Sequence, residues 1–360
     1  MSWIGLRDKV DGVFSPAGLS RPTRAPFDLN AVLPVGTLMI EFASDPRTGV
    51  QTIVEYGSCH PWAAGLIIQL TASGRLSLEQ WQGQDRKRFS FETGLVSPSG
   101  SVLVTYSWDA PRRKGVLAVD VSDGGPLLYL DLLAPLPMSK RDALRIMADH
   151  SHCRFGDGLC FAAIADEIVP IGVMPGLAPQ SLVSTPQGYM PVAELRAGQI
   201  VHTANGSTAQ VRWCGAATLP ARGRFAPLVL RAPYHGLLAD LTVSPDQRLR
   251  MNGAEVDYLF DKPTVAVRAG DMRDDRGVRA AHVGKTHTYH QILLDRAAPM
   301  RIAGMVVEGL DITGLRRDPA LRSHTILSQM PAELLPACMG GRVPVLQYYE
   351  ALTLRKLLAA

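Results

Sequence analysis

Cysteine is scarce in this sequence, and its 360 residues include only Cys59, Cys153, Cys160, Cys214 and Cys338. Thiols this far apart do not form a disulfide framework, and an odd number leaves at least one unpaired. Long apolar runs are missing as well, because no stretch approaches the ~20 apolar residues that a membrane span requires. The first residues also lack the apolar core of a signal peptide. We therefore expect no membrane span and, by default, a cytoplasmic location, with export without such a signal left open.

An excess of charge of one sign is also missing. The sequence has 37 basic and 33 acidic residues, which gives a net charge of +4. Its basic clusters are short, at Asp85-Arg86-Lys87-Arg88 and Pro111-Arg112-Arg113-Lys114, and we interpret both as hairpin tips. A nucleic-acid-binding protein usually gathers its positive charge on one face. We therefore expect no nucleic-acid partner.

The common catalytic signatures are absent too. The sequence contains no G-x-S-x-G, no P-loop, no H-E-x-x-H and no G-x-G-x-x-G motif. We therefore expect no cofactor. What is present is a globular balance of 46% hydrophobic and 19% charged residues, with 33 glycines and 26 prolines spread along the chain. Turns this frequent favour short strands over long helices.

The first half predicts a β-sandwich at residues 27–170, preceded by a loose, polar arm at 1–26. Short strand-like runs separated by turns recur throughout the sandwich region, as is typical of all-β domains. In one of them, Leu76 and Leu78 alternate with polar residues. A helix is predicted at Met138–His150, where Ser139 can cap the start.

The second half is again β-rich at 171–315 and then becomes a helical tail at 316–360. Asn205-Gly206 is the strongest hairpin signal in the chain, because a type I′ turn needs positive φ at both central positions. Helical spacing marks the end of the tail. The predicted apolar side of that helix is formed by Val345, Leu346, Tyr349, Leu352 and Leu357.

Several motifs in this second half occur in the order typical of one known family. They are Gln180–Gly188 with its Thr-Pro-x-Gly turn, Pro191–Val201, Val211–Gly215, Leu241–Arg248 and Tyr289–Arg296. Over about 174–312 the sequence resembles the Hint (hedgehog/intein) domain, in its alphaproteobacterial form. The resemblance implies an all-β horseshoe of two pseudo-symmetric halves. It also implies self-processing, in which a Cys or Ser attacks the preceding peptide carbonyl and a His donates a proton to the departing nitrogen.

The resemblance places three catalytic positions on residues that cannot perform this chemistry. The nucleophile position falls on Gly176, the His position on Gln247, and a later His-Glu pair on Ala297 and the alanine after it. Gln247 has no proton to supply near neutral pH. Ser181 is a weak alternative nucleophile, and we interpret it instead as a strand residue bonded to the backbone. Cys214 is likewise interpreted as a core residue.

The first half more loosely resembles a concanavalin-like (laminin-G-like) jelly roll. The Leu-x-Leu-x-x-Trp run ending at Trp81 and the run ending at Trp108-Asp109 carry this likeness. By analogy, Trp81, Trp108 and Asp109 are the residues where a glycan would bind.

A zinc site is the remaining hypothesis from the residues. His150, His152, Cys153 and Cys160 are candidate ligands within eleven positions, but they lack the C-x₂₋₄-C spacing of structural zinc sites. We therefore predict no metal.

Three functions stay open at this point. The favoured one is a Hint domain-containing protein without catalysis, acting as a structural or interaction module with a glycan or a protein as partner. The second is a self-cleaving Hint domain that uses Ser181 or another non-standard nucleophile. The third is a glycan hydrolase on the sandwich, although no clear carboxylate pair supports it.

Overall fold

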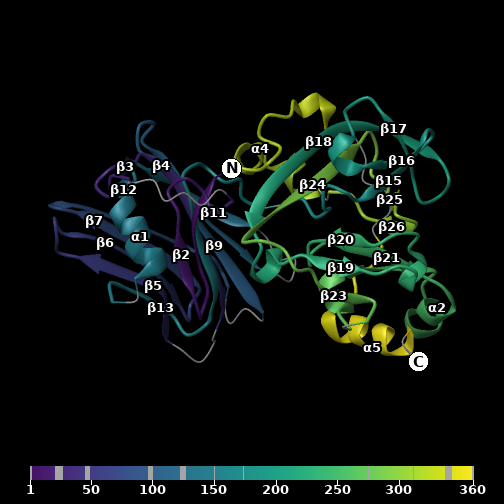
Figure 1. The fold of residues 1–360 in the computed structure, drawn as a ribbon, viewed down its shortest axis with the longest axis horizontal. Helices are drawn as coiled ribbons and strands as arrows, with labels where there is room; N and C mark the ends of the chain where they lie inside the picture. The colour runs from purple at the N-terminus through teal and green to yellow at the C-terminus, as the bar shows by residue number, and fades with distance from the viewer. Residues whose placement is uncertain are drawn as a thin grey trace. The chain divides into compact units, whose positions relative to one another are not determined.

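The computed structural model divides the chain into two compact units, Met1–Gly172 and Val173–Ala360 (Figure 1). Each unit is described by itself below. The structure describes residues 2–20, 27–44, 49–95, 100–121, 127–149, 151–172, 174–274, 276–310, 312–336 and 343–358.

The first unit is a sandwich of two antiparallel sheets. The larger sheet has the order β11-β10-β9-β4-β14-β1-β2, with β1 Trp3–Arg7, β2 Gly12–Phe14, β4 Val35–Ala43, β9 Ser101–Asp109, β10 Lys114–Val121, β11 Leu128–Leu133 and β14 Leu159–Ala165. The smaller has the order β13-β5-β6-β7-β8, with β5 Val50–Ser58, β6 Ala64–Thr71, β7 Arg75–Gln82, β8 Asp85–Glu92 and β13 Cys153–Phe155. One core joins the two sheets and includes Ile40, Leu78 and Val104. The predicted sandwich is confirmed.

One helix covers part of this sandwich. α1 (Lys140–Ala148) follows a short pair of strands, β3 (Val32–Leu33) and β12 (Met138–Ser139). Ser139 caps α1 and forms a capping box with Asp142, as its position in the sequence predicted. The helix then buries Ala143, Ile146 and Met147 against the core.

Two predictions for the first unit were wrong. The expected loose arm at 1–26 contains β1, whose five residues are all buried between β14 and β2. Gly5 lets Met147 of α1 pack closely there, since a Cβ on Gly5 would lie 2.5 Å from Cγ of Met147. The basic cluster at 85–88 is not a hairpin tip but the start of β8, which pairs with β7 along its whole length. The cluster at 111–114 does form the turn between β9 and β10.

The second unit consists of three small antiparallel sheets. They have the orders β16-β15-β25-β26-β21-β22, β17-β18-β24 and β20-β19-β23. Their strands are β15 Leu182–Thr185, β16 Gly188–Pro191, β17 Ile200–His202, β18 Thr208–Pro220, β19 Leu228–Leu230, β20 Leu241–Val243, β21 Arg248–Asn252, β22 Thr264–Arg268, β23 Val278–Ala280, β24 Thr286–Leu294, β25 Met300–Ile302 and β26 Met305–Val307. The helices are α2 Ala254–Phe260, α3 Thr313–Arg317, α4 Pro319–Ser323 and α5 Tyr348–Leu358, with 3₁₀ turns η1 Val192–Glu194, η2 Gly223–Phe225, η3 Tyr234–Gly236, η4 Ala269–Met272 and η5 Ala332–Leu334.

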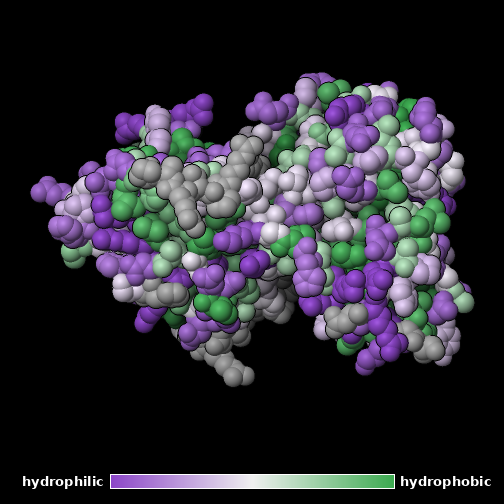
Figure 2. All heavy atoms as spheres, in the orientation of Figure 1, coloured by the Kyte–Doolittle hydropathy of each residue, from purple (hydrophilic) through white to green (hydrophobic). Residues whose placement is uncertain are grey.

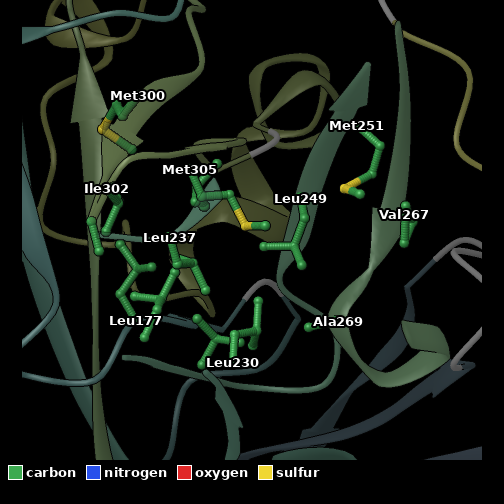
Figure 3. Packing of buried hydrophobic residues seen from close by; sticks show 14 of the residues in the cluster. Leu177, Leu230, Leu237, Leu249, Met251, Val267, Ala269, Met300, Ile302 and Met305 are labelled. Carbon is green, nitrogen blue, oxygen red and sulfur yellow. The ribbon is translucent and has the colours of Figure 1, made fainter. Parts of the chain in front are cut away.

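The core of this unit is aliphatic. Leu177, Leu230 and Ile302 lie close together in it, with Leu249 and Met305 nearby (Figure 3). Each comes from a different short segment, so the core holds together pieces that are far apart in the sequence. The mainly β fold expected for this half is therefore confirmed.

The hairpin at Asn205-Gly206 is present, but its turn differs from the one predicted. Only Gly206 has positive φ, at 78°. The backbone N–H of Gly206 donates to the carbonyl of Thr203, and the N–H of Thr203 donates to that of Ser207. These bonds close a longer loop than a two-residue type I′ turn, in which a single left-handed glycine is sufficient.

The helical tail packs against the core of the second unit. Leu346, Ala351 and Leu354 are buried in it, and the N–H of Leu346 donates to the carbonyl of Ala266 at 2.8 Å. The predicted apolar side was partly wrong, because Tyr349 is 68% exposed and Leu357 is 41% exposed.

Hydrophilic and hydrophobic residues are interspersed over the face drawn in Figure 2, on both units. Within the described ranges, no helix has the length and apolar character needed to cross a membrane.

Candidate functional site

The segment around Gly176 is held by backbone hydrogen bonds to two other strands. Leu177 exchanges both its backbone bonds with His290 of β24, at 3.0 and 2.7 Å. The carbonyl of Gly176 accepts from the N–H of Ser244 at 2.8 Å, just after β20. The Leu177 side chain enters the core (Figure 3). The chain at this point is therefore fixed between β20 and β24.

Gln247 lies directly against Gly176. A Cβ placed on Gly176 would be 2.5 Å from Oε1 of Gln247 and 2.9 Å from Oγ of Ser244. Two residues that are 71 positions apart in the sequence thus meet at one point, as do the nucleophile and the His in the catalytic arrangement that the resemblance implies. The approach is this close only because residue 176 has no side chain.

Two backbone carbonyls hold the Gln247 amide. Its Nε2 donates to the carbonyl of Glu308 at 2.9 Å and to that of Arg248 at 3.2 Å. Both amide hydrogens are therefore in use, and the side chain is only 5% exposed. An amide does not titrate, so this contact offers hydrogen bonds but no proton transfer near neutral pH.

The other predicted site residues do not complete a catalytic group. Ala297 lies in the loop between β24 and β25 and offers only a methyl group. Ser181 is 3% exposed, and its Oγ donates to the carbonyl of Thr242 at a long 3.5 Å. Its backbone is bonded on both sides, to Ala178 and Val192. Burial raises the pKa of the Cys214 thiol to about 11, which keeps it protonated.

Sequence reasoning overlooked two residues at this point of the fold. The Ser244 hydroxyl faces the place where a side chain on Gly176 would lie. His290 forms the backbone pair with Leu177, and burial lowers the pKa of its imidazole, with a further lowering from the Arg196 charge. Both occur in the family motifs quoted above, but the sequence does not show that they surround residue 176.

Two of the three glycan candidates, Trp81 and Trp108, line one small pocket of the first unit, whereas Asp109 lies at a hairpin turn. Trp108 is fully buried between the sheets and donates from Nε1 to the carbonyl of Leu33 at 2.9 Å. Asp109 is 8% exposed and accepts from the backbone and side chain of Arg112 at the hairpin turn.

Trp81 is the third candidate, and it points outward. The strand alternation of β7 buries Gln80 toward the other sheet and places Trp81 on the outer face. There its ring lies against Gly65, and the Arg86 guanidinium carbon is 5.5 Å from the ring centroid. Its aromatic surface is thus already partly covered.

The zinc candidates are also separated. Cys153 lies in β13 of the smaller sheet, whereas Cys160 lies in β14 of the larger one. His152 pairs with Asp149 at 2.7 Å, and His150 lies outside the described residues. In the part of the chain that the structure describes, no three or more His, Cys, Asp or Glu residues gather into a metal-binding group.

Part of the second unit is similar to a known family. Residues 175–314 match the model of the Hint domain family. No curated protein matches the chain.

Solved structures similar to parts of the chain include two of the intein type. The MchDnaB-1 intein has 13% identity and a TM-score of 0.25, and covers 37% of this chain and 98% of its own. The bacterial intein-like domain from Clostridium thermocellum has 13% identity and a TM-score of 0.27, with 38% and 99% covered. The CBM40 of the Ruminococcus gnavus IT-sialidase has 14% identity and a TM-score of 0.27, with 47% and 89% covered.

Proposed function

We propose that the Hint domain at residues 175–314 is a non-catalytic module that keeps the fold without the self-cleavage. Its role is then structural or that of an interaction module. The contact between Gly176 and Gln247 supports this proposal.

Self-cleavage needs a nucleophile next to the carbonyl that it attacks. At the Pro175–Gly176 bond the adjacent residue has no side chain, so no thioester or ester can form there. Positioned general-acid help is also missing, and its loss alone costs about 10²–10⁴ in rate. Without either group, the peptide bond is left to hydrolysis by water.

The place of the nucleophile is also occupied. Oε1 of Gln247 lies within 2.5 Å of the position that a Cβ would take. Because Nε2 of the same amide is bonded to two carbonyls, the side chain cannot swing aside without breaking those bonds. The loss of the nucleophile and the filling of its space therefore support the same interpretation.

Ser181 is a poor substitute nucleophile. It is five residues beyond Gly176, it is buried, and its hydroxyl already donates to the carbonyl of Thr242. To attack the Pro175 carbonyl it would have to leave a strand end that two backbone bonds hold.

Incubation of the full chain at neutral pH with dithiothreitol or hydroxylamine tests the proposal, with intact mass spectrometry as the measurement. We expect a single species of full mass after prolonged incubation. A pair of fragments split between residues 173 and 181, and suppressed in Ser181→Ala, would show that the domain is active. Ser184→Ala, in strand β15 three residues beyond Ser181, is the matched control.

A non-catalytic domain acts through what it binds, and the sequence analysis kept a glycan and a protein as possible partners. Trp81 and Trp108 line the same small pocket of the first unit, and Asp109 lies at a hairpin turn. A glycan or a protein therefore stays the proposed class of partner.

A further inference from the structure

Three asparagines occur in the chain, and glycine follows two of them, Asn205 and Asn252. In an Asn-Gly pair the backbone nitrogen of glycine can approach the side-chain amide carbon of asparagine, because no Cβ is in the way. Both pairs lie at exposed turns of the second unit, Asn205-Gly206 between β17 and β18 and Asn252-Gly253 between β21 and α2. Water reaches both pairs, so a difference in their chemistry must come from the contacts that hold each one.

Hydrogen bonds hold the Asn205 side chain in one position. Its Oδ1 accepts from Oγ1 of Thr203 at 2.6 Å, from Oγ of Ser207 at 2.8 Å and from the backbone N–H of Ser207 at 3.3 Å. The N–H of Gly206 donates to the carbonyl of Thr203 at 3.1 Å. Short polar side chains often bond the backbone of their own turn in this way. The amide carbon of Asn205 and the nitrogen of Gly206 are therefore each held by other groups.

The Asn252 side chain is not held in this way. Among the described residues, no group donates to its amide oxygen or accepts from its amide nitrogen. Its backbone pairs with Thr264 at the end of β21, after which Gly253 leaves the strand with φ 128°. No carbonyl in the described ranges accepts the N–H of Gly253. Apart from its chain neighbours, a Cβ on Gly253 would have one described atom within 4 Å, Oε2 of Glu255 at 3.2 Å. The amide carbon of Asn252 and the nitrogen of Gly253 are therefore free to meet.

We propose that Asn252 is a site of spontaneous deamidation and isoaspartate formation in the folded protein, and that the contacts of Asn205 protect it from the same reaction. The backbone nitrogen of Gly253 attacks Cγ of Asn252. The bond between this nitrogen and Cγ forms, and the bond between Cγ and Nδ2 breaks. The Nδ2 group leaves as ammonia with the proton that the Gly253 nitrogen loses. A succinimide ring remains in the chain, and water then opens it.

The side on which water opens the ring decides the product. Attack at Cγ restores the normal main chain and leaves an aspartate at position 252. Attack at the former backbone carbonyl of this residue leads the main chain through Cγ and gives isoaspartate. Both products add a negative charge, and isoaspartate also lengthens the main chain by a methylene between the buried residues Met251 and Val256. No peptide bond is lost, so this inference does not depend on the proposed loss of self-cleavage.

Incubation of the full chain at neutral and at alkaline pH tests the proposal, with tryptic digestion at mildly acidic pH and mass spectrometry of the peptides. Arg212 lies between the two pairs, so they fall in different peptides. We expect conversion at Asn252 to be at least about tenfold faster than at Asn205, since misplacing a reacting group costs this much or more. Conversion should be faster at alkaline pH, because the attacking nitrogen must lose its proton. Equal rates, faster conversion at Asn205, or no conversion at Asn252 over weeks would overturn the proposal.

The same measurement on the urea-unfolded chain separates the effect of the fold from that of the sequence. Unfolding removes the hydrogen bonds that hold Asn205, and it leaves both asparagines with glycine as the next residue. The two rates are therefore expected to become similar, mainly because conversion at Asn205 speeds up. A difference that persists in the unfolded chain would show that neighbouring residues cause it, and would refute the assignment to the folded contacts.

Substitutions test the two sites separately. Asn252→Gln lengthens the side chain and disfavours ring closure, so the mass change in that peptide should disappear while the thermal midpoint stays close to that of the parent. Its persistence would refute the site. Asn30→Gln is the matched control, because this amide accepts from Arg141 in the first unit and should affect neither rate. Thr203→Val combined with Ser207→Ala removes both hydroxyl donors to Asn205 and should speed its conversion several-fold. An unchanged rate in this double variant would overturn the proposed protection.

Discussion

Gly176 and Gln247 should be energetically coupled, because the side chain of one occupies the space that the other leaves empty. A methyl group on Gly176 would lie 2.5 Å from Oε1 of Gln247 and 2.9 Å from Oγ of Ser244. The Ser244 hydroxyl can rotate, but the Gln247 amide is tied to two carbonyls. We predict that Gly176→Ala destabilises the second unit by about 1–3 kcal/mol, the usual cost of overpacking a core.

Gln247→Ala removes the amide that a methyl group on residue 176 would meet, but the substitution itself lowers stability. The Arg248 carbonyl keeps a partner, since the N–H of Glu308 also donates to it at 3.0 Å. The Glu308 carbonyl loses the Gln247 donor, which predicts a cost of about 1–3 kcal/mol. In this background a methyl group on residue 176 no longer meets the amide oxygen and lies 2.9 Å from Oγ of Ser244 and 3.3 Å from Cβ of residue 247. The added cost of Gly176→Ala should therefore fall below about 1 kcal/mol. The expected coupling energy is therefore about 1–2 kcal/mol.

The double-mutant cycle of Gly176→Ala and Gln247→Ala is measured by urea unfolding, with Trp213 as the probe of the second unit. The other four tryptophans, at positions 3, 62, 81 and 108, all belong to the first unit. A fluorine label on tryptophan therefore gives one resonance that reports only the second unit. Gly284→Ala is the control, because a Cβ there would meet nothing within 4 Å. Additivity of the two changes within about 0.3–0.5 kcal/mol would refute the reasoning.

Three further predictions follow from the burial of titratable groups. Burial lowers the pKa of His235, His287 and His290, so the unfolded chain binds more protons than the folded chain below about pH 6.5. The urea concentration at half-unfolding, measured at Trp213, should therefore fall from pH 7 to pH 5. A midpoint that does not change with pH would contradict this prediction. Burial raises the pKa of Cys153 to about 12 and that of Cys214 to about 11, whereas Cys59 is exposed. Mass spectrometry should therefore find Cys59 alkylated before Cys153 and Cys214 at pH 8. Equal alkylation rates of the three thiols would contradict the prediction. Tyr56→Phe removes a donor to the buried Asp142 carboxylate and should lower stability of the first unit by about 1.5–3 kcal/mol; Tyr258→Phe, 85% exposed, should leave the thermal midpoint unchanged.

Local patterns predicted the sandwich because they act over few residues. Alternation along 75–82 placed Leu76 and Leu78 inward, and Ser139 marked the start of α1. The expectation of a loose arm at 1–26 missed β1 for a physical reason. A strand buried on both faces shows no alternation of apolar and polar residues. The glycines, prolines and arginines of the first 26 residues also obscured its short apolar run. The prediction of the buried side of the C-terminal helix was also partly wrong, because only part of the helix surface packs on the core and Tyr349 and Leu357 stay exposed.

The candidate site could be predicted in part. Motif order placed residues 176 and 247 at related positions, and the structure brings them into contact. The sequence did not reveal that the amide of Gln247 bridges to Glu308, since that contact spans 61 residues. The sequence also predicted Trp108 as a glycan contact, and the structure shows that this side chain is buried and donates to the carbonyl of Leu33.

The proposed loss of Hint chemistry is compatible with the fold, because the hydrogen bonds that hold the segment at Gly176 do not involve a side chain at that position. The segment at Gly176 is held by the backbone pair between Leu177 and His290 and by the bond from Ser244 to the Gly176 carbonyl. The Leu177 side chain anchors it in the core. None of these interactions needs a side chain at position 176. The proposed loss of the nucleophile is therefore compatible with an intact scaffold, and the space beside Gly176 is filled by Gln247, whose amide donates to two backbone carbonyls. The proposed separation of fold from activity rests on these single contacts.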